Sequence, residues 1–330
     1  MILNGHVDVV PAGPANLWHS PPFEPHLDGD WLYGRGAGDM KAGVIANLFA
    51  LEALKSIGLQ PAATVSLQGV CEEESTGNGT LACLVRGYRA DAVLISEPTG
   101  LALVRANVGV VWFQIHVKGH PVHVSQGHTG ANAIEAAFAL VQGLKTLEAR
   151  WNEERHRHPH HKDLPHPINF NVGKIHGGDW ASSVPAWCTL DMRASFYPGT
   201  DPKDAMAEIE ENLTATAASQ PFLANNPPRV TYNGFTTAGY TLTPGSAAEA
   251  TLGRAHQTAT GQPLAERTST AYLDARVYAL YGDCPALVYG PLAENVHGFD
   301  ERVSLASIQR ATAAIALFVA QWCGLEKRPQ

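Results

Sequence analysis

Apolar positions in the first hundred residues form short runs separated by longer segments of helical periodicity. The runs at 2–10, 64–70 and 92–96 have the length of strands, whereas apolar residues recur at helical spacing over 42–57 and, more briefly, over 81–85. This alternation predicts an α/β fold with a mixed, largely parallel sheet and flanking helices. Because functional groups gather at the carboxyl ends of parallel strands, the residues that follow each run are candidates for chemistry.

The middle of the chain has a different pattern. Apolar residues alternate with more polar ones over 111–117, as in a strand with one buried face. The pattern then indicates a helix over 131–151, strands over 168–175 and 188–196, a helix with Asp201 as N-cap and Pro202 in its first turn, and a strand over 229–232. This order, β-α-β-β-α-β, is typical of a ferredoxin-like α+β domain.

The α/β pattern returns after about residue 232. Helices are predicted over 247–258, 274–281 and 304–323, and a strand over 286–289. The α+β segment is therefore predicted to be inserted into the larger domain. The expected division is 1–107 and 226–330 for the two parts of the larger domain, with 108–225 inserted between them.

Composition narrows the classes of function. With 330 residues, 45% of them hydrophobic and 16% charged, the chain is long enough for two globular domains. A net charge of −8 offers no basic surface for nucleic acid and favours a small-molecule substrate. No apolar stretch reaches the roughly 18 residues of a membrane helix and the N-terminus lacks signal-peptide features, so we expect a cytoplasmic protein without membrane contact. The five cysteines are scattered and include no CxxC pair, which argues against a disulfide framework or a cysteine-based zinc site.

A histidine-rich segment over 155–166 could in principle bind metal. Its histidines are interrupted by prolines and have no fixed spacing that would impose a coordination geometry. A solvated loop is the favoured interpretation.

Imidazole and carboxylate groups lie near the end of the first predicted strand and in the glycine-rich turn that comes later. His6 and Asp8 lie on the same side of an extended chain, where the acid can hold the ring of a metal-binding histidine, although a simple hydrogen-bonded pair is commoner. Asp39 ends the glycine-rich part of the turn at 34–41 and either caps the next helix or presents a carboxylate. An acid at this position disfavours a phosphate site.

Three carboxylates, at 72–74, come directly after the second strand. Such crowding is unfavourable unless a cation or water neutralises it, so the alternatives are a metal site and a solvated acidic turn. Glu97 follows the next strand, and His297 lies in a polar loop near the C-terminus. Carboxylates and imidazoles without thiolates suit a pair of zinc ions, but spacing alone does not select the ligands.

Five motifs nevertheless resemble those of a known enzyme family. In chain order they are Gly5-His6-Val7-Asp8, Gly36-Ala37-Gly38-Asp39-Met40-Lys41, Glu73-Glu74-Ser75-Thr76-Gly77, Glu97-Pro98-Thr99 and His297-Gly298-Phe299-Asp300-Glu301. In this order and at these separations they are similar to the zinc aminoacylase and deacetylase family, which includes acetylornithine deacetylase and succinyl-diaminopimelate desuccinylase. The similarity covers essentially the whole chain.

The resemblance implies a site for two Zn²⁺ per chain, in which Co²⁺ can substitute. His6 and Glu97 would hold one ion, and Glu74 and His297 the other. Asp39 would bridge the two ions. The inserted domain would act as a lid and as the contact of a homodimer.

The resemblance also implies roles for residues around the metals. Asp8 would steady His6, and Glu73 would be the general base that deprotonates the attacking water. His123 would reach into the partner subunit's site and stabilise the oxyanion, unless it is a hydrogen-bonded histidine at a strand end. Arg276 would bind the substrate's carboxylate, unless it forms a structural salt bridge.

The chain departs from the family pattern in three places. Family members have a further strand and helices before the first strand seen here, so we expect upstream sequence. Glu72 stands where Asp is commoner, and Ser183 precedes Val-Pro where many relatives have asparagine.

The function implied is hydrolysis of the amide bond of an N-acyl amino acid. A metallo-dipeptidase or carboxypeptidase is the alternative within the same chemistry, since these substrates also place a carboxylate beside an amide. A truncated homologue that binds metal without activity is the third possibility.

Overall fold

The computed structural model describes residues 1–328, and the chain divides into two compact units. The first comprises Met1–Ala106, Thr241–Thr268 and the segment from Leu273 onward. The second comprises Asn107–Tyr240 and Ser269–Tyr272. The second unit thus lies within the sequence of the first.

A parallel sheet forms the centre of the first unit. Its strands are β1 (Ile2–His6), β5 (Ser66–Val70), β6 (Val93–Ile95) and β15 (Ala286–Val288), in the order β15-β6-β1-β5. β1 is fully buried with a neighbour on each side, and it buries the polar side chains of Asn4 and His6 together with Ile2 and Leu3. This is the α/β architecture expected from the sequence.

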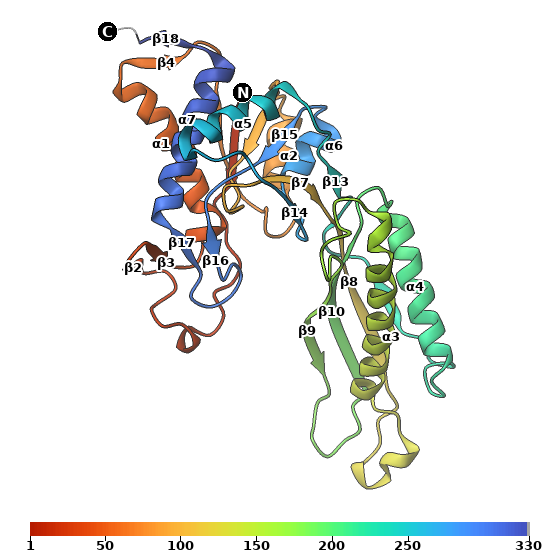
Figure 1. Ribbon diagram of the computed structural model, residues 1–330. Helices are drawn as coiled ribbons and strands as arrows, with labels where there is room; N and C mark the ends of the chain where they lie inside the picture. The colour runs from red at the N-terminus through yellow and green to blue at the C-terminus, as the bar shows by residue number, and fades with distance from the viewer. Residues whose placement is uncertain (329–330) are drawn as a thin grey trace. The chain divides into compact units, whose positions relative to one another are not determined.

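Helices flank this sheet. They are α1 (Ala42–Ser56), α2 (Asn78–Val85), α5 (Ala247–Thr260), α6 (Ala275–Tyr281) and α7 (Leu305–Cys323). α7 packs against both α1 and α5, and α2 packs against α6. Figure 1 shows α1 and α7 on one side of the sheet and α2 and α6 on the other.

Short strands outside the parallel sheet were not predicted. They pair as β13-β7-β14, as β16-β17-β3-β2 and as β18-β4. Their bounds are β2 (His26–Asp28), β3 (Trp31–Tyr33), β4 (Leu59–Pro61), β7 (Leu103–Asn107), β13 (Tyr240–Thr241), β14 (Glu266–Ser269), β16 (Ala293–Glu294), β17 (Arg302–Ser304) and β18 (Leu325–Lys327). Most are two or three residues long, too short for alternation to be recognised.

The first predicted strand is too long. It ends at His6, and residues 7–10 leave the sheet. The backbone N–H of Val7 still bonds to Val70, but its side chain is 41% exposed. The chain therefore turns away immediately after the histidine.

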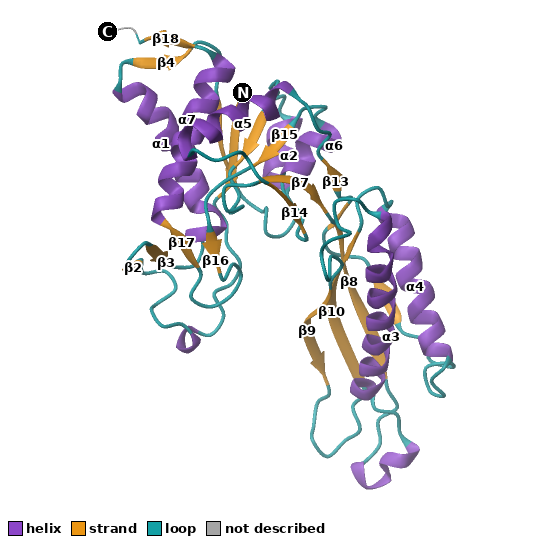
Figure 2. Ribbon diagram, in the orientation of Figure 1, coloured by secondary structure: helices purple, strands orange, loops and turns teal. Residues whose placement is uncertain are grey.

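The second unit is an antiparallel sheet covered on one face by two helices. Its elements are β8 (Gly109–Lys118), α3 (Ala133–Glu153), β9 (Phe170–Gly177), β10 (Trp187–Phe196), α4 (Pro202–Ala218) and β11 (Arg229–Thr231). The strand order is β11-β8-β10-β9, so that β10 lies between the two strands joined by α3. This is the β-α-β-β-α-β arrangement, and Figure 2 shows α3 and α4 side by side on the sheet.

Residues after the expected boundary at 225 also belong to the second unit. β11 pairs with β8, and β12 (Thr236–Thr237) pairs with β8 farther along. The unit therefore extends to Tyr240. Asp201 caps α4 as predicted, since its side chain accepts a hydrogen bond from the Lys203 N–H.

The histidine-rich segment is not simply a solvated loop. His161 is 1% exposed and packs edge-on against Tyr197, while His158 stacks on the same ring. Within residues 1–328, the clusters of side chains close enough to share an ion include no histidine of this segment. The same part of the chain contains no helix with the length and apolarity needed to cross a bilayer.

Candidate active site

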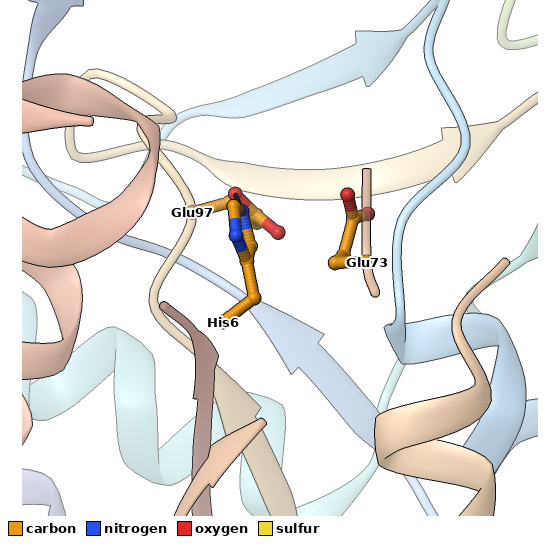
Figure 3. A group of neighbouring side chains, drawn as sticks. All are labelled: His6, Glu73 and Glu97. Carbon is orange, nitrogen blue, oxygen red and sulfur yellow. Dashed lines mark ion pairs between the residues drawn. The ribbon is translucent and has the colours of Figure 1, made fainter. Parts of the chain in front are cut away.

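The parallel sheet brings three of the sequence motifs together. His6 is the last residue of β1, Glu73 and Glu74 follow β5, and Glu97 follows β6. Because β5, β1 and β6 are parallel neighbours, their carboxyl ends meet at one edge. Figure 3 shows the Glu97 carboxylate beside the His6 ring, with Glu73 facing them.

Asp39 lies between two imidazoles. Its Oδ1 is 3.1 Å from His6 Nε2, and its Oδ2 is 3.3 Å from His297 Nε2. The carboxylate is carried by the irregular turn Ala37–Lys41, in which Asp39 itself is not helical (φ −112°, ψ 99°) and which is preceded by Gly36 in the left-handed conformation (φ 79°). A residue with a side chain is strained at that φ, which explains the glycine.

Each imidazole has a second carboxylate of its own. Glu97 Oε2 is 3.9 Å from His6 Nε2, and Glu74 Oε2 is 3.1 Å from His297 Nε2. The site is therefore two histidine–glutamate pairs with one aspartate shared between them.

Asp8 fixes the far side of the His6 ring. His6 Nδ1 is 3.0 Å from the Asp8 carbonyl oxygen and 3.5 Å from its carboxylate Oδ1. Asp8 Oδ2 also accepts a hydrogen bond from the Glu74 N–H. With Nδ1 directed at Asp8, Nε2 is the nitrogen that faces the other acids.

Charge crowding perturbs the acids of the site. Burial raises the pKa of Glu73 well above its usual value, and Glu97 raises it further. Burial likewise raises the pKa of Glu97. Burial also acts to raise the pKa of Asp39, but its contacts with His297 and His6 outweigh this and hold the pKa well below its ordinary range.

The pKa values of both imidazoles are raised. Burial acts to lower the pKa of His6, but hydrogen bonds to Asp39 and Asp8 raise it far above its ordinary value. Contacts with Asp39 and then Glu74 raise the pKa of His297 to about 10. The site thus has an excess of negative charge that favours bound cations.

The donors fit divalent metal ions. Glu97 Oε1 is buried and, among the described residues, has no hydrogen-bond partner, as expected of an atom that serves as a ligand. Two groups have donor atoms close enough to share an ion, one made by His6, Glu73 and Glu97 and the other by His6, Asp39 and Glu74. Carboxylate oxygens and imidazole nitrogens suit zinc or cobalt.

The other two predicted residues are placed differently. His123 belongs to the second unit, where it caps the short helix η3 (Val124–Thr129) and accepts a hydrogen bond from the Ser125 N–H. Arg276 lies in the first turn of α6, is 4% exposed, and donates a hydrogen bond to the Thr76 carbonyl. These contacts resemble those of structural residues, and the two binding roles stay predictions.

Two buried acids near the site were not singled out from the sequence. Asp274 is 1% exposed, accepts a hydrogen bond from the Thr80 hydroxyl, and has a pKa raised by burial to about 6. Glu301 is 1% exposed and binds the turn that carries Asp39. Glu301 is the last residue of the fifth motif and Asp274 lies two residues before Arg276, but nothing in one sequence shows that either acid is buried.

The family model for peptidase family M20/M25/M40 matches residues 2–321. The chain belongs to this family. It is therefore a hydrolase that acts on amide bonds, as are relatives named deformylase and desuccinylase.

Curated relatives of the family align over almost all of this chain. An N-formyl-4-amino-5-aminomethyl-2-methylpyrimidine deformylase of Halalkalibacterium halodurans is 29% identical over 99% of this chain and 80% of its own length. A succinyl-diaminopimelate desuccinylase of Cupriavidus necator is 29% identical over 94% of this chain and 78% of its own length.

Solved structures show the same fold at lower identity. The di-peptidase Dug1p of Saccharomyces cerevisiae superposes with a TM-score of 0.80 at 15% identity, over 100% of this chain and 80% of its own. Human carnosine dipeptidase 1 superposes with a TM-score of 0.78 at 15% identity, over 98% of this chain and 80% of its own. At this identity the likeness concerns the fold alone.

Proposed function

We propose that this protein is a zinc-dependent amidohydrolase that removes the acyl group from an N-acyl amino acid. The observation that carries the proposal is the position of Asp39, whose two oxygens face two histidines that each have their own glutamate. A carboxylate shared in this way is the arrangement of a dinuclear metal site.

His6 and Glu97 would hold one zinc ion, His297 and Glu74 the other, and Asp39 both. When bound, the ions supply Lewis-acid polarisation of the scissile carbonyl and a lowered pKa for water, and cobalt can substitute for zinc. Asp8 supports this assignment because its contacts orient His6 Nε2 toward the shared carboxylate.

Glu73 is the proposed general base. It is 6% exposed, and burial beside Glu97 raises its pKa, which brings it closer to the range where a carboxylate exchanges protons near neutral pH. It would take the proton of the attacking water and deliver it to the nitrogen of the departing amine. The C–N bond then breaks and a carboxylic acid and an amine are released.

Relatives support an acyl amide as the substrate. Both curated relatives described above carry names of enzymes that remove a formyl or succinyl group. A dipeptidase is the second candidate, favoured by the fold neighbours named as dipeptidases. Kinetic assays of the zinc-loaded protein with N-formyl, N-acetyl and N-succinyl amino acids and with dipeptides separate the two.

The expected result is a value of kcat/KM for at least one N-acyl compound well above that for any dipeptide. The reverse order would assign a peptidase. Two bound zinc ions without turnover of any of these compounds would instead support a metal-binding homologue without activity.

We further propose a homodimer in which His123 stabilises the oxyanion in the partner's site. His123→Ala and Glu73→Gln variants are each expected to be nearly inactive. After unfolding and refolding of a 1:1 mixture, half of the dimers carry one intact site, so about a quarter of the wild-type activity should return. Absence of recovered activity in a mixture shown to contain mixed dimers contradicts action across the dimer.

A further inference from the structure

A carboxylate outside the metal site ties two of its loops together. Glu301 lies just before β17 and is 1% exposed. Its Oε1 accepts hydrogen bonds from the backbone N–H groups of Gly38, at 2.9 Å, and Asp39, at 3.0 Å. Its Oε2 accepts from the Gly36 N–H, at 3.1 Å.

Arg35 completes this arrangement. Its Nη1 donates to Glu301 Oε2 at 2.6 Å, and its Nη2 donates to the Gly298 carbonyl at 2.9 Å. Both side chains are at most 5% exposed, so the charges neutralise one another away from water. The Glu301 carbonyl also accepts a hydrogen bond from the Gly34 N–H. Side chain and backbone of Glu301 therefore both hold the 34–39 turn.

The two segments joined in this way carry Asp39 and His297. The loop at 295–300 holds Asn295, His297 and Asp300 at positive φ, of 54°, 64° and 55°. Non-glycine residues keep this conformation only where the surroundings impose it. Arg35 binds this loop at Gly298, directly after His297.

We propose that Glu301, with Arg35, is a positioning residue that sets the spacing between Asp39 and His297 and so determines the affinity of the dinuclear site. This inference rests on the proposed function for its metal and goes beyond it by assigning a role to a residue that is not a ligand. Glu301 touches neither substrate nor metal in this proposal. It acts through the Asp39 backbone and through the loop that presents His297.

Glu301→Gln tests the proposal with little change in size. In glutamine one of the two carboxylate oxygens becomes an NH₂ group, which donates hydrogen bonds and cannot accept them. That NH₂ group must then point either at the N–H groups of Gly38 and Asp39 or at the donors of Arg35 and Gly36, and the hydrogen bonds on that side are lost. Glu294→Gln is the matched control, because the Glu294 carboxylate also pairs with an arginine in the same region, Arg302, instead of accepting from the backbone of the 34–39 turn.

Zinc affinity is measured by competition with a chromophoric chelator on folded protein. Glu301→Gln should weaken it by about 10- to 100-fold, with kcat restored by excess zinc and KM unchanged. Glu294→Gln should stay within about twofold of wild type. A purely structural role would lower the unfolding midpoint without changing the affinity, and that result overturns the proposal.

Hydrogen exchange of the metal-free protein tests the role of Glu301 independently of whether the chain binds zinc. Glu301→Gln should raise exchange at both 34–41 and 295–301, whether or not the wild-type protein binds zinc. Unchanged exchange at either segment overturns the role of Glu301, whereas a wild-type chain that takes up no zinc overturns the proposed function. If Glu301→Gln does not fold, the Arg35→Lys variant is tested in its place. Lysine keeps the positive charge but lacks the second nitrogen with which Arg35 donates to the Gly298 carbonyl. Unchanged zinc affinity and unchanged hydrogen exchange in Arg35→Lys also overturn the proposal.

Discussion

Glu73 and Glu74 are adjacent in sequence and have different surroundings. Glu74 Oε2 lies 3.1 Å from His297 Nε2, whereas Glu73 is buried near His6 and Glu97. Two neighbouring carboxylates can therefore serve as ligand and base. Burial raises the pKa of Glu73, as suits a group that must exchange a proton during the proposed reaction.

Glu73→Gln should lower kcat by about 10²- to 10⁴-fold while zinc content stays unchanged, because the amide keeps the shape of the side chain and cannot accept the proton. Steady-state assays and metal analysis of the same preparation measure both. The control is Glu72→Gln, a change at the neighbouring exposed glutamate, which should leave kcat near wild type. Near-normal turnover by Glu73→Gln would remove this residue from the mechanism.

His161 makes the second prediction at the residue scale. Burial lowers its pKa from 6.5 to about 4, so the unfolded chain binds the proton more tightly and stability is lost as the pH falls below 6.5. Between pH 7.5 and pH 5 the contribution of His161 to the free energy of unfolding, taken as wild type minus a variant without this histidine, should fall by about 2 kcal/mol.

Denaturant unfolding at both pH values measures this loss. His161→Phe should lose less stability on acidification than wild type, whereas a change at the exposed His128, His128→Gln, should not alter the pH dependence. An equal dependence in wild type and His161→Phe would contradict the assignment.

Residue roles could be predicted only where motifs carry them. The five ligands were selected by resemblance to a family, because histidines and acids scattered over nearly 300 positions have no spacing that identifies them. No role could be assigned from the sequence to Glu301, the last residue of the fifth motif, or to Asp274, because their importance depends on burial and on partners far away in sequence. Arg35, for example, precedes Glu301 by 266 residues.

At the scale of elements, close packing of α1 against the end of β6 positions Glu97. A Cβ on Gly43, near the start of α1, would lie 1.8 Å from the Ser96 carbonyl oxygen. The Ser96 hydroxyl also donates to Asn47 Oδ1 in the same helix. The glycine lets the helix approach the residue that directly precedes Glu97.

Gly43→Ala should therefore lower the free energy of unfolding by about 3 kcal/mol and weaken zinc binding, because the helix must move away from 96–97. Gly253→Ala is the matched control, since this helical glycine in α5 has open space around it. It should stabilise the protein by about 0.5–1 kcal/mol. Chemical denaturation distinguishes the two, and a stable Gly43→Ala variant would show that the contact is not tight.

Element prediction succeeded where the pattern was long. Helix α1 was expected over 42–57 and spans Ala42–Ser56, and α7 was expected over 304–323 and spans Leu305–Cys323. It failed for β2, β3, β16 and β17, which are held by pairing with one another rather than by an apolar face. Such strands depend on long-range contacts that local patterns do not contain.

At the scale of the whole molecule, the charge of the site links metal content to pH. In metal-free protein, burial raises the pKa of Asp274 to about 6, and contacts with acids raise that of His297 to about 10. A group whose pKa is raised by folding stabilises the folded protein at low pH, and this stabilisation is lost as the pH rises through the folded-state pKa. The loss falls between pH 3.8 and about 6 for Asp274 and between pH 6.5 and about 10 for His297. Metal-free protein should therefore be less stable at pH 8.5 than at pH 5.5.

Zinc should reverse this trend because cations replace protons as partners of the acids. Removal of metal by a chelator should abolish activity, and free zinc at 100 times its dissociation constant should raise the free energy of unfolding by about 2.7 kcal/mol for each ion bound. Unfolding curves at pH 5.5 and 8.5, with and without zinc, provide the measurement. If the stability of the metal-free and the zinc-loaded protein depended on pH in the same way, the carboxylates of the site would not be ligands of the ions.

The carboxylates gathered around Asp39 also impose an order on events. A substrate with its own carboxylate would be repelled by a pocket whose acids are unneutralised, since like charges at such short range oppose entry. If cations bind here as proposed, they would have to arrive first and reverse the local potential before an anion could bind beside Asp39. An anionic substrate would thus bind only to protein that already holds its metal ions, so the metal-free protein would not take up substrate.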